Sequence, residues 1–364
     1  MAPAPDSKLA ALAVDPSASL DQSLDRLAGW LGALHSNGTF NGTVLIAKDG
    51  HVLFKQHYGC ADLAGRIPLS DHSSFSLASA SMPFTALGIM LLAQAGKLEL
   101  DDLLTKHVPE VAFYDRITLR HLLHHTSGIA DHVDLVDQHW IEGQLLTMPD
   151  LIALFARHKP RAYFAAGQSF EFSNTGYAFL GEVIGRASGS SYPAFMSEAI
   201  FKPLGMNDTA AFNLTNKEFP LRSRVYGLRR SVGRTVLSDL NFFDGIFGDG
   251  GIYSSADDLL RWDVALRAGT LLPAEIYQQA YVSGRLNNGE ATGYGFGWEI
   301  EPSNVVEHWG AWEGFVTHVR RDLVRNTLLV TLSNLGPAST TDPICEALAA
   351  FVGRMNWSGA TQPG

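Results

Sequence analysis

The stretch that decides the fold is Phe75-Ser76-Leu77-Ala78-Ser79-Ala80-Ser81-Met82-Pro83-Phe84-Thr85-Ala86, where small and hydroxyl-bearing residues lead into an apolar segment. From Ser79 the apolar residues recur about every 3.6 residues as far as Gly96, which predicts a helix. Ser79 then falls in the first helical turn, beside unpaired backbone N–H groups and the positive end of the helix dipole. The pattern makes Ser79 a candidate nucleophile with a stabilised acyl adduct; a simple helix N-cap is the alternative.

Composition indicates a folded protein with two subdomains. The 364 residues are long for one core, and 46% hydrophobic with 18% charged residues is ample for a buried interior. A net charge of −10 without a basic run argues against a nucleic-acid partner. No run of about 18 apolar residues occurs, so we predict no membrane span. We expect a soluble protein, cytoplasmic or exported with a signal peptide absent from this sequence, and the composition leaves its oligomeric state open.

Neither cysteines nor histidines predict a metal or cofactor. Cys60 and Cys345 are the two cysteines and have no Cys-x-x-Cys spacing, so we expect free thiols. His121 and His125 are spaced i and i+4, yet no His-Glu-x-x-His pattern accompanies them. The segment 131–139 has metal-like composition without a defined geometry, and we interpret it as a solvated polar loop.

Both ends of the chain contain helix and strand patterns. An amphipathic helix over Ser17–His35 precedes a hairpin pattern made of Phe40–Lys48, the turn Asp49-Gly50 and His51–Tyr58. Near the other end four segments have strand character and a fifth is helical: Gly293–Ile300, Asn304–His308, Phe315–Arg320, Thr327–Leu332 and Asp342–Phe351.

Two motifs resemble those of a known family. The segment from Phe75 to Glu110, followed by His121-Leu122-Leu123-His124-His125-Thr126-Ser127-Gly128, resembles serine hydrolases built like class C β-lactamases and penicillin-binding proteins, including esterase-like members. In that family the helix opens with Ser-x-x-Lys, where lysine assists deprotonation of the serine. Here the motif reads Ser79-Ala80-Ser81-Met82, with a thioether at the lysine position. The family's Tyr-x-Asn corresponds to Phe172-Ser173-Asn174, which keeps the asparagine and lacks the phenol.

A third motif, Lys-Thr-Gly or His-x-Gly in the family, corresponds to His308-Trp309-Gly310. The resemblance implies that this strand runs beside Ser79 and that the backbone N–H groups of Ser79 and Ala311 form an oxyanion hole. Gly310 suits a close approach of substrate to backbone. Because His308 is the titratable side chain left in the motifs, we predict that it is catalytic with Ser79. The other motif positions predicted to line the site are Met82, Phe172, Asn174, Trp309 and Gly310.

The resemblance implies an α+β fold of the β-lactamase/penicillin-binding-protein type. Its antiparallel sheet is flanked by the N- and C-terminal helices and joined to a mainly helical subdomain. We predict an N-terminal tail over residues 1–15, a sheet subdomain from 16–70 and 285–364, and a helical subdomain with long loops over 71–284.

The same resemblance implies that Ser79 attacks an ester, amide or lactam carbonyl of a small-molecule substrate, and that water later releases the acyl group. Because methionine and phenylalanine stand at the lysine and tyrosine positions, we expect strongly altered or impaired general-base machinery. Loss of a general base usually lowers the reaction rate by about 10²–10⁴-fold. Glu171, Asp249 and Glu313 flank the motifs, and any of them is a candidate replacement. Two alternatives stay open: a non-hydrolytic enzyme of acyl or proton transfer, and a catalytically dead binding protein.

Overall fold

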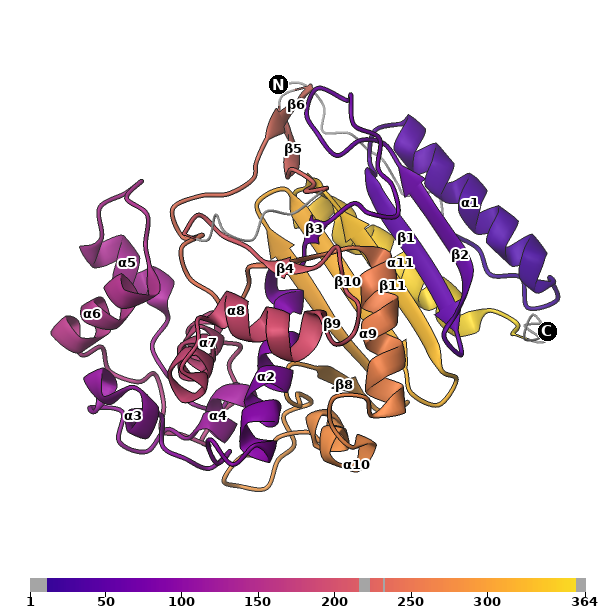
Figure 1. The fold of residues 1–364 in the computed structure, drawn as a ribbon. Coiled ribbons are helices and arrows are strands. Elements are labelled where there is room, and N and C mark those ends of the chain that lie inside the picture. The colour runs from indigo at the N-terminus through magenta and orange to yellow at the C-terminus, as the bar shows by residue number, and fades with distance from the viewer. Residues whose placement is uncertain (1–11, 216–222, 232, 358–364) are drawn as a thin grey trace.

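A six-stranded antiparallel sheet joins the two ends of the chain (Figure 1). The computed structural model describes residues 12–215, 223–231 and 233–357. The sheet order is β2-β1-β11-β10-β9-β8, and the register of its central pair places Leu45 opposite Val330. Its strands are β1 (Gly42–Lys48), β2 (His51–Tyr58), β8 (Glu299–Glu301), β9 (Val305–Trp312), β10 (Phe315–Asp322) and β11 (Thr327–Ser333).

The N-terminal elements follow from local sequence. Helix α1 (Leu20–Ser36) begins with a capping box, in which Ser19 and Gln22 each bond the other's backbone N–H. Between β1 and β2, Asp49 and Gly50 both have positive φ, 51° and 81°, as a two-residue hairpin turn requires. The helix and hairpin predictions are confirmed.

Helices cover both faces of the sheet. On one face α1 and α11 (Ala338–Arg354) pack against it, with Leu31 and Leu348 in one core cluster with Val44 and Ile46. On the opposite face α9 (Ala256–Ala268) contacts β1 and β11 (Figure 1). The alternation of side chains along each strand thus supplies two separate apolar cores.

The remaining helices surround α2 (Met82–Gln94), which is apolar on all sides and nearly wholly buried. Helix α7 (Asn174–Ser188) packs across it, with Ile184 near Gly88. The other helical elements are α3 (Leu104–His107), η2 (Pro109–Val111), α4 (Leu119–Leu123), α5 (His132–His139), α6 (Met148–His158), α8 (Tyr192–Met196), the π-helical turn η3 (Ser197–Phe201), α10 (Ala274–Tyr277) and η4 (Gln278–Tyr281).

Two small sheets fix long loops. The one that matters for the site has the order β3-β7-β4, formed by Phe75–Ser76, Ile252–Ser254 and Ala210–Ala211. The pairing of β3 with β7 continues as a hydrogen bond from Leu77 N to Ile252 O, 2.8 Å, and so brings the loop before β7 to Ser79. The other sheet joins β12 (Leu335–Gly336), β5 (Leu228–Ser231) and β6 (Arg234–Leu237).

Two predicted elements differ from the structure. Ser79 lies in a 3₁₀ turn, η1 (Ala78–Ser81), and the α-helix begins only at Met82. The strand expected over Gly293–Ile300 is confined to β8. Gly293 and Gly297 have φ of 74° and 75°, and a Cβ on Gly297 would lie 2.6 Å from Pro83 Cα, so the chain bends there against α2.

The α+β fold class is confirmed, with both chain ends in one antiparallel sheet flanked by α1 and α11. The three predicted domain boundaries stay predictions, and most of the expected tail, residues 1–11, lies outside the described residues. Among the helices of the described ranges, none combines the length and apolar character needed to cross a membrane.

Candidate active site

The turn that carries Ser79 is held by hydrogen bonds on both sides. Ser81 is fully buried and its Oγ accepts from Ile252 N at 3.2 Å, while Ser76 Oγ accepts from Ala78 N at 3.3 Å. Ala78 has a φ of 48°, a left-handed conformation that is strained for a residue with a Cβ. The side chain of Ser79 is partly exposed and lines a cavity of about 220 Å³, which we call the Ser79 cavity.

The Ser79 cavity combines polar groups with aromatic walls. Its polar lining consists of Ser76, Ser79, His132, Asn174, Asp244 and Asp249. Its aromatic lining consists of Phe212, Phe243, Tyr253 and Trp312. Among the residues that the structure describes, no lysine or arginine lines it.

Strand β9 runs beside η1 and contributes Ala311 to the cavity lining. The short β8 pairs only with Val305–Glu307, so within the described chain residues 308–312 have no strand partner on that side. At Gly310 a Cβ would lie 2.0 Å from Leu77 O and 2.9 Å from Ala80 N. Only glycine permits this approach, which brings the backbone of Ala311 to the same cavity as Ser79.

Met82 and His308 meet at a tyrosine that the sequence motifs do not include. The hydroxyl of Tyr294 lies 3.9 Å from Met82 Sδ and 2.9 Å from His308 Nε2. His308 Nδ1 lies 2.7 Å from the carbonyl oxygen of Trp309, which can only accept, so Nδ1 carries the ring hydrogen. Burial lowers the pKa of His308 to about 4, and the neutral ring therefore accepts the Tyr294 hydrogen at Nε2. In this arrangement His308 has no free lone pair for Ser79.

The second motif lies at the start of α7. Ser173 is the helix N-cap, Asn174 lines the Ser79 cavity, and Phe172 is 42% exposed. The Phe172 ring lies 6.2 Å from the His308 ring between centroids, so the second and third motifs are neighbours. Trp309 instead stacks on His318 at 3.8 Å and is not part of the cavity lining.

Of the three flanking carboxylates, Asp249 alone lines the Ser79 cavity. Glu171 is exposed, and Glu313 accepts hydrogen bonds from Ser238 Oγ at 2.7 Å and Asn241 Nδ2 at 2.6 Å. Gly250, which follows Asp249, would place a Cβ 3.8 Å from Ala78 O. Burial raises the pKa of Asp249 above its ordinary value, while His132 opposes that shift.

Sequence reasoning missed Asp244 and the position of His132. Asp244 lies in the loop before β7, and no motif or spacing marks it. His132 begins α5 and the residue is 3% exposed, so the solvated-loop interpretation is wrong for this residue. Its Nδ1 lies 3.0 Å from Thr175 Oγ1. Asp131 is a residue type that favours a helix N-cap and could have indicated a helix start at His132, but the burial of the histidine is visible only in the structure.

The histidines after the first helix have separate partners. His121 Nδ1 contacts Thr118, and His124 Nδ1 contacts Tyr294 O at 3.0 Å. His125 Nδ1 accepts from Ser173 N at 3.1 Å, and its ring packs on Phe172 with a centroid distance of 4.5 Å. In the described ranges no group of three or more metal-ligand side chains comes together.

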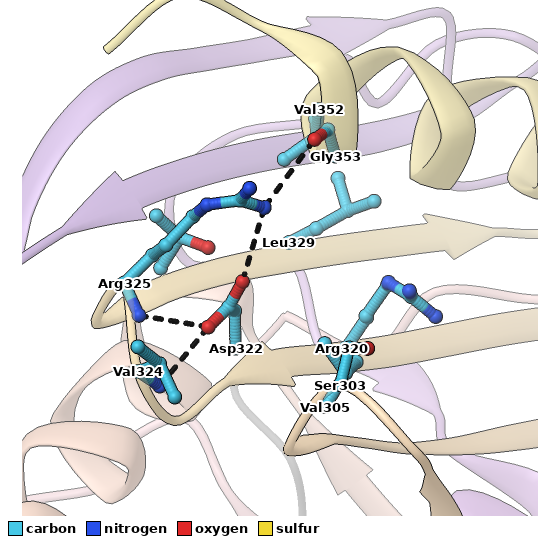
Figure 2. Close-up of a pocket in the computed structure, with 10 residues that line it drawn as sticks. Ser303, Val305, Arg320, Asp322, Val324, Arg325, Leu329, Val352 and Gly353 are labelled. Atoms are coloured by element: carbon cyan, nitrogen blue, oxygen red, sulfur yellow. Dashed lines mark hydrogen bonds and ion pairs between the residues drawn. The ribbon is translucent and has the colours of Figure 1, made fainter.

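A second cavity, of about 320 Å³, lies where β9, β10 and β11 meet the end of α11 (Figure 2). Its charged groups are already paired. Arg325 bonds Asp322 and the carbonyl oxygen of Gly353, and Arg320 forms ion pairs with Glu301 and Glu307. This second cavity shares no lining residue with the Ser79 cavity. The Ser79 cavity is therefore the candidate active site.

Comparison with known proteins identifies the family to which this chain belongs. The family model described as Beta-lactamase matches residues 25–354, which include the whole site. The chain belongs to the Beta-lactamase family. This superfamily consists of serine hydrolases that act on ester, amide and lactam carbonyls.

Relatives of this Beta-lactamase family member include penicillin-binding proteins. It is 36% identical over 324 residues to penicillin-binding protein 4* of Bacillus subtilis, covering 85% of this chain and 71% of that protein. A penicillin-binding protein structure from Bacillus halodurans is 26% identical, with a TM-score of 0.73 over 87% of this chain and 98% of that one. An octameric penicillin-binding protein homologue from Pyrococcus abyssi is also 26% identical, with a TM-score of 0.75 and coverage of 93% and 78%.

Proposed function

We propose that this protein is a slow serine hydrolase that acts through Ser79 on the ester, amide or lactam carbonyl of a small molecule. The observation that carries the proposal is that Ser79 and Ala311 line one cavity, at the free edge of β9. The family membership supports the reaction class, since its members use a serine nucleophile.

The oxyanion is stabilised by backbone N–H groups. In this proposal the N–H groups of Ser79 and Ala311 point to the oxygen that becomes negative as Ser79 Oγ attacks the carbonyl carbon. Such donors are preorganised and typically contribute about 3–4 kcal/mol to transition-state stabilisation. The close approach at Gly310 and the strained φ of Ala78 support this role, because strain at a residue is retained where the surrounding structure requires it.

Asp249 takes the proton of Ser79 in this proposal. Met82 and Phe172 stand at the positions that the family resemblance assigns to lysine and tyrosine, and His308 Nε2 is occupied by Tyr294. Asp249 lines the cavity, and burial raises its pKa, which makes its carboxylate a stronger base than an exposed one. A carboxylate is still weaker than a lysine amine, so slow turnover follows.

Labelling with a fluorophosphonate probe tests the nucleophile. We expect intact mass to show one slow adduct and peptide mapping to place it on Ser79. The Ser79→Ala variant should not react, whereas Ser81→Ala, which removes a neighbouring buried hydroxyl, should still be labelled. Labelling that survives Ser79→Ala would refute the assignment, and a wild-type protein that reacts with no probe would favour the binding-protein alternative.

The fate of the acyl group separates hydrolysis from acyl transfer. With an activated ester, hydrolysis yields the free acid at the same rate whether or not an alcohol or amine acceptor is added. Acyl transfer would instead give an acceptor-dependent product. In the same assay Asp249→Asn should lower the acylation rate by about 10²–10⁴-fold, the usual contribution of a general base.

A further inference from the structure

The segment His125-Thr126-Ser127-Gly128 supports the loop that leads into the second motif. Its backbone oxygens accept three hydrogen bonds from that loop: Tyr163 N to Gly128 O at 2.8 Å, Gly167 N to Thr126 O at 2.8 Å and Glu171 N to His125 O at 3.0 Å. At Gly128, whose φ is 66°, a Cβ would lie 2.2 Å from Phe164 O, so the two backbones are in close contact. The segment therefore fixes the path of the loop as far as residue 171.

The side chain of His125 extends this support to Ser173. Its Nδ1 accepts from Ser173 N at 3.1 Å, and the residue is 1% exposed. Burial lowers the pKa of His125 well below its ordinary value, so the ring is neutral. Because Nδ1 keeps its lone pair for Ser173, Nε2 carries the ring hydrogen. His125 thus holds the loop twice, by its backbone at Glu171 and by its ring at Ser173.

Ser173 connects this hydrogen bond to the Ser79 cavity. It is the N-cap of α7, where its Oγ accepts from Gly176 N at 3.1 Å, and the next residue, Asn174, lines the cavity. The bonded N–H belongs to the planar peptide group between Phe172 and Ser173, so its hydrogen bond sets the direction of the chain at the start of α7. The position of Asn174 in the cavity wall therefore depends on His125.

Aromatic rings surround the rest of the His125 side chain. Its ring lies 4.5 Å from the ring of Phe172, 4.9 Å from that of Tyr177 and 4.5 Å from that of Tyr294, between centroids. Among the residues that the structure describes, Nε2 has no hydrogen-bond partner, and a φ of 57° adds backbone strain. An apolar side chain would avoid the unpaired donor. What it could not supply is the acceptor for Ser173 N.

We propose that His125 is a positioning residue for the Ser79 reaction, which by accepting from Ser173 N fixes the first turn of α7 and holds Asn174 in the wall of the Ser79 cavity. In the described chain His125 does not itself line the cavity, so it acts through Ser173. A displacement of about 1 Å in an active site can lower a rate by about 10²-fold. This inference rests on the proposed function, because the reaction that depends on the position is the acylation of Ser79.

Three substitutions separate the acceptor from side-chain size and backbone strain. His125→Asn supplies Oδ1, attached to Cγ as Nδ1 is, and asparagine tolerates positive φ. His125→Leu has a similar volume and no acceptor, whereas His125→Gly relieves the strain and also has no acceptor. With a saturating activated ester, intact mass should show Ser79 acylation at least about tenfold slower in the leucine and glycine variants, and within about threefold of wild type in His125→Asn. Equal losses in His125→Asn and His125→Leu would overturn the inference.

Hydrogen exchange measures the effect on the turn without requiring catalysis. The amide of Ser173 should exchange at least about tenfold faster in His125→Leu than in wild type, because it loses its acceptor, and His125→Asn should restore the protection. If Ser173 exchanges at the wild-type rate in His125→Leu, the hydrogen bond does not hold the turn and the proposal fails.

A substitution in the outer core controls for loss of stability. Leu348→Ala opens a cavity between α11 and the sheet, so it should lower the midpoint of urea denaturation at least as much as His125→Leu. It should keep the wild-type rate of Ser79 acylation, because it lies in the other core cluster. An equal loss of rate in Leu348→Ala would refute the positioning role, since general destabilisation would then explain the effect.

The wild-type protein distinguishes this inference from the proposed function. Acylation of Ser79 that is equally fast in wild type and in His125→Leu would contradict the inference and leave the hydrolase proposal intact. A wild-type protein whose Ser79 forms no acyl adduct would refute the hydrolase proposal and, with it, the kinetic role of His125. Faster exchange of Ser173 in His125→Leu would in that case limit His125 to holding the loop.

Discussion

The hydroxyl of Tyr294 donates a hydrogen bond to Nε2 of His308 over 2.9 Å, and the tyrosine side chain is 1% exposed. Tyr294 belongs to a glycine-rich bend against α2, whereas His308 belongs to β9. The bond thus connects the strand of the third motif to the helix that begins at Met82. It also makes His308 a satisfied, neutral residue of the core.

Removal of the Tyr294 hydroxyl should destabilise the protein. In Tyr294→Phe the buried His308 Nε2 has no donor, and an unsatisfied buried acceptor costs about 1–3 kcal/mol in the free energy of unfolding. Urea denaturation measures the loss. Tyr226→Phe is the control, since Tyr226 is 38% exposed, and we expect a change within about 0.5 kcal/mol. Equal losses in the two variants would show that the Tyr294–His308 bond contributes nothing.

His308 should make stability depend on pH in the acid range. Burial lowers its folded-state pKa to about 4, below the unfolded value of about 6.5, so the unfolded chain takes up a proton first as pH falls. The stabilisation is complete above pH about 6.5 and is lost as pH falls towards 4, by at most about 3 kcal/mol. His124, with its pKa also lowered by burial to about 4, adds a similar loss.

His308→Gln should therefore flatten the pH dependence of the unfolding free energy between pH about 7 and 4.5. The pH dependence of the unfolding free energy that remains in this variant is due to His124 and the other titratable groups. His51→Gln, at an exposed position on β2, should keep the wild-type slope. If His308→Gln and wild type show parallel curves, the histidine is not held neutral by burial.

Gly310→Ala should separate β9 from the Ser79 turn. Its Cβ would lie 2.0 Å from the backbone oxygen of Leu77, and backbone cannot move aside as a flexible side chain can. We expect a loss of about 1–3 kcal/mol in stability and a much slower reaction of Ser79 with a fluorophosphonate. Gly29→Ala in α1, where nothing lies within 4 Å of the added methyl, should instead gain about 0.5–1 kcal/mol and keep the labelling rate. Unchanged labelling in Gly310→Ala would contradict the proposed oxyanion hole.

The sequence predicts the parts of this fold that depend on neighbouring residues. The capping box of α1 and the Asp49-Gly50 turn are local, so the elements around them are correct to within a few residues. The order of strands in the sheet is not local, because β1 pairs with β11 across most of the chain. The residues alone therefore predict no strand order, and the family resemblance supplies most of the expectation that both chain ends share one sheet.

The site is less predictable for the same reason. Ser79 and Ala311 are found through motifs, but Tyr294 acts on His308 through a bend that the alternating pattern of 293–300 hides. Asp244 and His132 enter the cavity from loops whose positions are fixed by distant partners, Trp312 and Thr175. Polarity alone led to the interpretation of 131–139 as a solvated loop, and no sequence feature marked Asp244.

Met82→Lys combined with Phe172→Tyr should raise the hydrolysis of an activated ester by at least about tenfold, since one positioned base is usually worth about 10²–10⁴. Position 82 is fully buried, 3.9 Å from the Tyr294 hydroxyl, so burial would lower the pKa of the new amine and leave part of it neutral and basic at pH 7. Each single variant should recover less than the pair, because groups that relay one proton act as a unit.

A matched control separates the amine from the change of shape. Met82→Leu with Phe172→Tyr keeps the packing at position 82 and supplies no base, so it should show no gain beyond that of Phe172→Tyr alone. The lysine variant should also lose stability, because methionine packs there without a desolvation cost. Circular dichroism and fluorophosphonate labelling of Ser79 confirm that each variant is folded and that its nucleophile is present. If the folded double variant still hydrolyses the ester no faster than wild type, the pocket serves something other than acyl-serine chemistry, and the hydrolase proposal fails.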